Sequence, residues 1–212
     1  FTVDESANYL LTGMANSYGI VQHKRYDDMI AEHSNYVPSR SRHTYPYSSF
    51  MVPLRLVSSI ITYRNRTMLK HLRYAYRGAV THRTGLGFMG FEETLISEGI
   101  SGNRTMEYRD PTRMGVTTRT ETRDRDVDLY YANTDFTAAK TCNPVLTRSV
   151  ETNKLTGVKK ETQLFYDAFN NPTRERISFG NGNIYTESVQ TYRNVVTPER
   201  YFVGLPLTTT TT

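Results

Sequence analysis

The sequence predicts an all-β protein: an array of antiparallel β-hairpins that forms part of a large curved or shell-like sheet. The composition favours strands, because 16 tyrosines and 9 phenylalanines, without tryptophan, accompany many threonines, and aromatic and β-branched side chains suit a pleated, half-exposed surface. Short strand-like runs recur at even intervals between turn signals, whereas helical periodicity is nearly absent. We therefore interpret residues 1–212 as one β-rich segment with no linker that divides it.

The N-terminal part is predicted to contain two strands and then a loop-rich insertion. Residues 8–27 form the two strands around Asn16-Ser17-Tyr18-Gly19, because glycine permits the positive φ of a tight turn. Residues 28–50 are polar, aperiodic and interrupted by proline, which predicts the insertion, with one helical turn over residues 28–33.

Two further strands are predicted over residues 54–63 and 67–77, joined at residues 64–66. In the second strand, alternate residues that include Tyr74 and Tyr76 share one face, and the residues between them share the other. This alternation indicates a sheet with one packed face and one solvated face.

Glycine and phenylalanine alternate in the next segment, where Gly85, Gly87 and Gly90 are interleaved with Phe88 and Phe91. Glycine removes the Cβ where one chain segment passes close to another, and aromatic rings supply the buried area that glycine lacks. The pattern predicts a corner of the sheet in which each ring has a neighbour, followed by a strand over residues 88–97. Because no catalytic chemistry needs this pattern, a structural role is the first hypothesis.

The C-terminal half is predicted to be a series of strands with turns between them. Residues 114–131 form one long polar strand, and residues 133–144 form a loop. Turn signals at Gly157 and at the Asn- and Gly-rich stretches then separate short strands over residues 145–152, 158–166, 173–179 and 184–192. The closing tract Thr208–Thr212 is expected to be a frayed end.

The charge pattern argues against nucleic acid as a partner. A net charge of +5 and a pI near 9.3 suit an anionic partner. The basic residues are nevertheless scattered among acidic ones, as in residues 121–126, which indicates a solvated face. No apolar run has the length of a membrane helix, so no direct membrane span is expected. The chain starts at Phe1 without a signal peptide, and we expect it to be a piece of a larger polypeptide.

The sequence lacks the usual signatures of an enzyme. One cysteine, Cys142, excludes a disulfide framework and a cysteine zinc site, and an inert thiol is expected there. The five histidines have no ligand spacing, and neither a nucleophile elbow nor a P-loop occurs. Glu92 and Glu93 are adjacent on a strand and should point to opposite faces. We therefore predict no enzyme activity and no catalytic residue, cofactor or metal site.

Asp124, Asp126 and Asp128 recur at two-residue spacing and offer the one alternative to that prediction, a calcium site. An EF-hand would need glycine and glutamate where Leu129 and Asp135 stand. Arg125, which alternates with these aspartates, favours a ladder of salt bridges over calcium.

Three segments together resemble a known family. The run Tyr74–Phe91, with its "YAYRGA" and "GLGFMGF" stretches, resembles the "YxYxGA…GRGFLGF" segment of the B component of bacterial Tc insecticidal toxins and of related Rhs-type shell proteins. Leu86 and Met89 stand where that segment has arginine and leucine. Residues 9–19 are similar to the family's "LLTxxxNxxGG" hairpin, and residues 165–173 are similar to a YD repeat with Asn-Asn in place of Gly-Arg.

The resemblance implies a strip of β-hairpins coiled into a hollow shell. In that family the B and C components enclose a toxic enzyme and deliver it through a pore-forming A component. The chain would then be a non-enzymatic wall segment of a secreted bacterial toxin complex, and its partners would be the rest of the B/C shell, the enclosed cargo and the A-type component. Tyr166 would pack on the adjacent hairpin and Asp167 would accept backbone N–H bonds in its turn. The implied structural residues are Tyr74, Tyr76, Gly85, Gly87, Phe88, Gly90, Phe91, Tyr166 and Asp167.

A rival hypothesis is a carbohydrate- or surface-binding β-module. Its stacking platforms would be tyrosines such as Tyr45, Tyr47, Tyr130 and Tyr131. Nucleic-acid binding through the arginines is a third class, for which only weak, salt-sensitive retention is expected.

Overall fold

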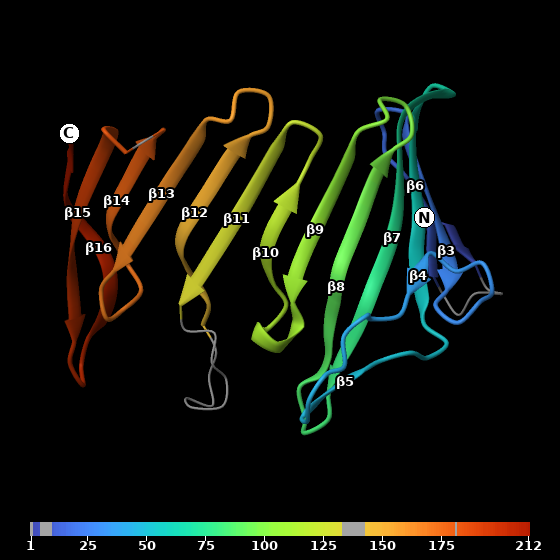
Figure 1. Cartoon of the computed structure of the whole chain (residues 1–212), viewed down its shortest axis with the longest axis horizontal. Helices are drawn as coiled ribbons and strands as arrows, with labels where there is room; N and C mark the ends of the chain where they lie inside the picture. Colours follow the sequence, from blue (N-terminus) through green and yellow to red (C-terminus); the bar gives the residue numbers. More distant parts are fainter. Residues whose placement is uncertain (1, 5–9, 133–142, 181) are drawn as a thin grey trace. The chain divides into compact units, whose positions relative to one another are not determined.

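The computed structural model describes residues 2–4, 10–132, 143–180 and 182–212 (Figure 1). Strands make up 67% of the structure, and the described residues contain no α-helix. The hydrogen-bonded order is β1-β2-β3-β6-β7-β8-β9-β10-β11-β12-β13-β14-β15-β16, with β4 and β5 both paired to β7. The pairings are antiparallel except for β4 with β7, and the sheet is not closed. The prediction of an all-β fold built from antiparallel hairpins is confirmed.

The chain forms two compact units, Phe1–Thr117 and Thr118–Thr212. The described elements of the first are β1 (Thr2–Asp4), β2 (Leu10–Ala15), β3 (Ile20–Asp28), β4 (Tyr36–Val37), β5 (Tyr47–Ser49), β6 (Arg55–Arg64), β7 (Thr67–His82), β8 (Gly87–Glu98), β9 (Arg104–Asp110) and the 3-10 turn η2 (Pro111–Arg113). Those of the second are β10 (Val116–Glu121, which starts at the end of the first unit), β11 (Arg125–Ala132), β12 (Val145–Asn153), β13 (Lys159–Tyr166), β14 (Pro172–Phe179), β15 (Ile184–Val196) and β16 (Tyr201–Thr211).

The long strand β7 organises the first unit. Its first half, residues 67–73, pairs with β6, and its second half, residues 76–82, pairs with the short strands β4 and β5 of the insertion. Its other edge pairs with β8 over nearly the whole length. The insertion therefore continues the sheet beside β7 at the point where β6 leaves it, as Figure 1 shows for β5.

The prediction for the insertion is correct about its loops and incomplete about its strands. Residues 28–34 form two successive turns, with N–H groups of Ala31 and Ser34 donating to carbonyls three residues earlier, and no helical turn is assigned there. The short strands β4 and β5 of the insertion were not predicted. Outside the insertion, strand β9 was also not predicted, because arginine and glutamate residues obscure its alternation.

The core of the first unit is small. Its buried members are Met29, Tyr36, Leu56 and Ala79, and Phe50, Tyr76 and Phe91 pack against them. All of these lie on β7, β8, β6 or the insertion, so this cluster packs the insertion against the neighbouring strands.

The second unit is a meander of hairpins, in which each strand from β10 to β16 pairs with the next. The single long strand predicted over residues 114–131 is wrong: β10 and β11 are antiparallel, and the chain turns at residues 122–124. The turn contains no glycine, proline or asparagine; it is closed by Thr122, whose N–H donates to the carbonyl of Arg125 at 2.8 Å. The frayed end predicted for the closing threonines is also wrong, because residues 208–211 pair with β15.

Candidate functional site

The first candidate site is a cluster of aromatic rings where the insertion covers β7 and β8. The rings of Tyr76 and Phe91 have centroids 4.6 Å apart, and those of Phe88 and Phe91 are 5.4 Å apart. Phe50 lies 5.4 Å from Phe88, and Tyr36 lies 6.2 Å from Phe91. Tilted and edge-on contacts of this kind are the favoured geometries of aromatic pairs. Each phenylalanine of the glycine-rich segment thus has a ring neighbour, as the sequence predicted.

Tyr36 joins the insertion to β7 and was not identified from the sequence. Its ring is buried, and its hydroxyl accepts the N–H of Ala79 at 3.1 Å and donates to the carbonyl of Phe50. Burial raises the pKa of this tyrosine; the nearby carboxylate of Glu92 acts in the same direction, and the bond from Ala79 opposes it. Tyr36 lies in a polar stretch without periodicity, so no local pattern marks it as a core residue.

Tyr74 and Tyr76 are neighbours on one face of β7, with stacked rings 6.5 Å apart. The Tyr76 hydroxyl donates to the carbonyl of Val57 at 3.0 Å, and burial raises its pKa to about 12. Burial, assisted by Glu107, also raises the pKa of Tyr74. Both phenols are therefore neutral near pH 7 and act as ring surfaces, and that of Tyr76 also as a hydrogen-bond donor.

The glycines of the hairpin between β7 and β8 adopt positive φ: 120° at Gly85, 74° at Gly87 and 101° at Gly90. A Cβ built on any of the three would meet nothing within 4 Å. The expectation that close chain packing requires these glycines is therefore wrong, and their backbone conformation is the reason for them. The close approach occurs instead at Gly78, where a Cβ would lie 1.8 Å from Oε2 of Glu92 and φ is 65°.

The adjacent glutamates Glu92 and Glu93 contact different partners. Nε2 of His43, from the insertion, lies 3.2 Å from Oε1 of Glu92, and Nη1 of Arg77 lies 3.1 Å from Oε2 of Glu93. This separation agrees with the alternation of side chains along a strand. The Glu92 side chain thus contacts His43 of the insertion and lies against Gly78, so its role is structural.

The second candidate site is the Tyr-Asp turn between β13 and β14. Oδ1 of Asp167 accepts the backbone N–H groups of Phe169 at 2.8 Å and Asn171 at 2.9 Å, as predicted. The Tyr166 hydroxyl donates to the carbonyl of Leu146, on the neighbouring strand β12, at 2.7 Å. The Tyr-Asp pair thus ties its own turn and the next strand together.

Asp167 also connects this turn to the hairpin of β15 and β16. Its Oδ2 accepts the side-chain amides of Asn171 and Asn194, each at 2.9 Å. Oδ1 of Asn194 in turn accepts the N–H of Gly204 at 2.8 Å. These bonds, led by that of the Asn171 amide, lower the pKa of Asp167 to about 2. Sequence reasoning missed Asn194 and Gly204, because no motif links residues so far apart.

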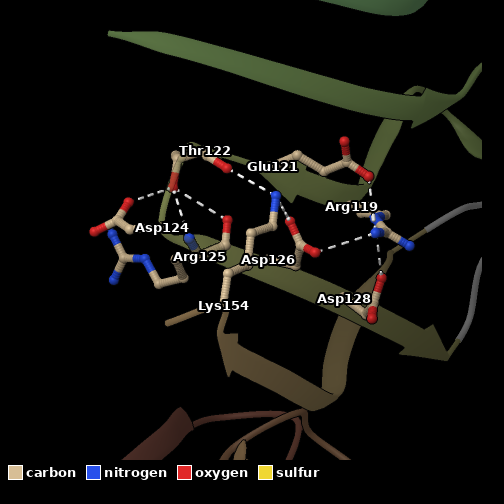
Figure 2. Close-up of polar contacts among 8 residues, drawn as sticks. All are labelled: Arg119, Glu121, Thr122, Asp124, Arg125, Asp126, Asp128 and Lys154. Carbon is tan, nitrogen blue, oxygen red and sulfur yellow. Dashed lines mark hydrogen bonds and ion pairs between the residues drawn. The ribbon is translucent and has the colours of Figure 1, made fainter. Parts of the chain in front are cut away.

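The three aspartates of the calcium alternative lie in a network of ion pairs, shown in Figure 2. Arg119 contacts Asp126 at 3.4 Å and Asp128 at 3.7 Å, and Nζ of Lys154 lies 2.7 Å from Oδ1 of Asp126. Asp124 lies in the turn, where a bond from the Thr122 hydroxyl is the main cause of its lowered pKa. The described residues contain no group of His, Cys, Asp or Glu that could hold a metal ion. Salt bridges are therefore present at Asp126 and Asp128, but Arg119 and Lys154 supply them, whereas Arg125 pairs with Glu151.

The tyrosines of the binding-module hypothesis lie in different surroundings, two in each unit. Tyr47 packs on His82 and donates to the carbonyl of Thr112, and the Arg148 guanidinium lies over the ring of Tyr130. Burial raises the pKa of Tyr131, whereas Tyr45 is exposed. Tyr47 and Tyr130 are therefore already in contact with other side chains.

Three remaining predictions concern positions that the structure does not describe. Cys142 and most of the loop over residues 133–144 lie outside the described residues, as does Tyr9 at the start of the first hairpin motif. Within the described part of the chain, no helix is long and apolar enough to cross a membrane.

No protein-family model matches this chain, and a search of curated proteins finds no match either.

Proposed function

We propose that this chain is a non-enzymatic wall segment of a toxin-enclosing β-shell of the Rhs-like type found in the B component of Tc toxins. It contributes to a secreted bacterial complex that encloses a toxic cargo, together with the remainder of a B/C-type shell and a pore-forming A-type component. It acts through contacts between sheets and not through chemistry at a pocket.

One observation carries the proposal: no described residue of the second unit is buried. A sheet that packs on a core buries alternate side chains, whereas a wall between two aqueous compartments is wet on both faces. The seven successive strands β10–β16 contain no buried residue among those described, which matches a wall that is wet on both faces.

The ring cluster of the first unit supports the same proposal. Tyr74, Tyr76, Phe88 and Phe91 are positions of the motif that resembles the family, and they form contacts with one another and with the insertion. The Tyr-Asp turn, at the position of a YD repeat, links successive hairpins through Asp167. Both features join strand to strand, as a wall segment requires.

The test is the shape of the particle that the parent polypeptide forms. We expect negative-stain electron microscopy to show a hollow outline, and an enclosed cargo domain to resist added protease. Gly78→Val, which forces a side chain against Glu92, should open the wall and expose the cargo to cleavage. A compact globule without an internal space, or cargo cleaved equally in both forms, would refute the proposal.

A further inference from the structure

The loop of the insertion that joins β4 to β5, residues 38–46, contains a short basic segment. Arg40 and Arg42 alternate there with Ser39 and Ser41, and both arginines are exposed. Figure 1 shows the loop leaving β4 and returning to the sheet at β5. The loop therefore presents two cationic side chains to solvent between two strands that are both paired to β7.

The backbone of the first part of this loop is weakly held. Within the described part of the chain, residues 38–43 form no hydrogen bond between backbone groups. The Ser39 hydroxyl accepts the N–H of Ser41 at 3.1 Å and donates to the carbonyl of Ser41 at 3.2 Å. Segments with so few hydrogen bonds open locally at low cost, and exposed loops with small and polar residues are the preferred places for proteolytic nicking.

The chain on either side of the loop is firmly bound to the sheet. Before the loop, the hydroxyl of the buried Tyr36 accepts the N–H of Ala79 at 3.1 Å. After the loop, the N–H of Phe50 donates to the carbonyl of Ala79 at 2.8 Å. In addition, β3 pairs with β6 along its whole length. A break within residues 38–43 would therefore leave both new ends attached to the same sheet.

The arginines of the loop are also free to enter a binding pocket. Among the described residues, no ion pair involves Arg40 or Arg42. Proteases of the trypsin type bind arginine through a carboxylate in their specificity pocket, and an unpaired guanidinium has no internal contact to lose.

Arg66 provides the matched comparison. It is equally classed as exposed, but it lies in the two-residue turn between the paired residues Arg64 and Thr67, with a φ of 69°. Binding in an extended conformation would require the ladder between β6 and β7 to open. The structure therefore contrasts two exposed cationic sites that differ in how tightly their backbone is held.

From the free arginines and the weakly held backbone we propose that residues 38–43 are a processing site for a protease of the trypsin type. The protease hydrolyses the peptide bond after Arg40 or Arg42. The bond between the arginine carbonyl carbon and the next nitrogen breaks; water supplies the hydroxyl group of the new carboxyl and a proton to the released amine. Cleavage cuts the insertion while its two halves stay on the sheet, which goes beyond the proposed wall function.

The test treats the 212-residue chain with an arginine-specific protease, because the structure describes every arginine. Mass spectrometry over time should show cleavage after Arg40 or Arg42 at least about 100-fold faster than after Arg66. The double variant Arg40→Gln/Arg42→Gln should lose the fast cleavage, and Arg66→Gln should keep it. The two fragments should elute together in size-exclusion chromatography and separate only in urea.

Three results would overturn the inference. Cleavage after Arg66 at the same rate would show that exposure alone sets the cutting. Separation of the fragments in native buffer would show that the ends of the loop are not anchored. Resistance of the same bonds in the parent particle would exclude a processing site in the assembled protein. The proposed function is judged separately, by whether that particle is hollow.

Discussion

The two units are built from similar strands but are stabilised differently. The first unit buries Met29, Tyr36, Leu56, Ala79 and Val80, whereas no described residue of the second unit is buried. The second unit is instead held by ladder hydrogen bonds, by turn acceptors such as Asp167, and by ion pairs such as those of Arg119. Burial of apolar area is the main favourable term in folding, and exposed ion pairs contribute little. The insertion, which supplies Met29 and Tyr36 to the core, thus accounts for the difference between the units.

The largest expected effect is the loss of a ring from the first unit. Phe91→Ala removes a side chain that packs on Tyr76, Tyr36 and Phe88, and should cost about 3 kcal/mol of unfolding free energy in urea melts. Tyr201→Ala, at a tyrosine 72% exposed in the second unit, should change the free energy of unfolding by less than about 0.5 kcal/mol. Equal effects would remove the contrast between the units.

The next prediction compares two glycines of the first unit, one required for its backbone conformation alone and one required also for close packing. Gly87→Ala meets open space and should cost only the left-handed backbone, about 1 kcal/mol. Gly78→Ala adds a clash with Glu92 to the same backbone cost, for about 2 to 3 kcal/mol in all. The measurement is the urea midpoint of each variant in the same buffer. A larger decrease for Gly87→Ala than for Gly78→Ala would contradict the placement of the close contact at Gly78.

In the second unit the corresponding test removes a side chain that stabilises the fold through hydrogen bonds. Asn194→Ala removes the donor to Asp167 and the acceptor for the N–H of Gly204, and should cost about 1 to 2 kcal/mol. The matched control is Asn183→Ala, at an exposed asparagine in the turn between β14 and β15. Urea unfolding followed by circular dichroism should show a lower midpoint for Asn194→Ala and an unchanged midpoint for Asn183→Ala.

A smaller effect is expected from pH. Hydrogen bonds lower the folded-state pKa of Asp167 to about 2, whereas an unfolded aspartate has a pKa of about 3.9. The stability that this residue contributes is therefore fully present above about pH 4 and is lost as the pH falls toward 2. Asp167→Asn should flatten this part of the urea-midpoint curve; an unchanged slope would show that the carboxylate is not the titrating group.

The comparison also explains how far sequence reasoning reached. Alternation and aromatic content predicted most strands, because these signals are local. The turn at residues 122–124 was missed because Thr122 closes it without a glycine or proline, and β16 because its threonine tract has no apolar alternation. The Asp167 turn acceptor followed from a motif, whereas its partner Asn194 depends on how two hairpins lie side by side. Tyr36 is likewise a core residue only through tertiary contacts.

Hydrogen exchange measured by mass spectrometry on the 212-residue chain and on the parent particle tests the wall interpretation most directly. In the isolated chain we expect slow exchange in β7 and β8 and fast exchange across β12–β16, because only the first unit has a core. In the parent particle the second unit should become as protected as the first. Equal protection of both units in the isolated chain would contradict a wall that is wet on both faces and depends on its neighbours.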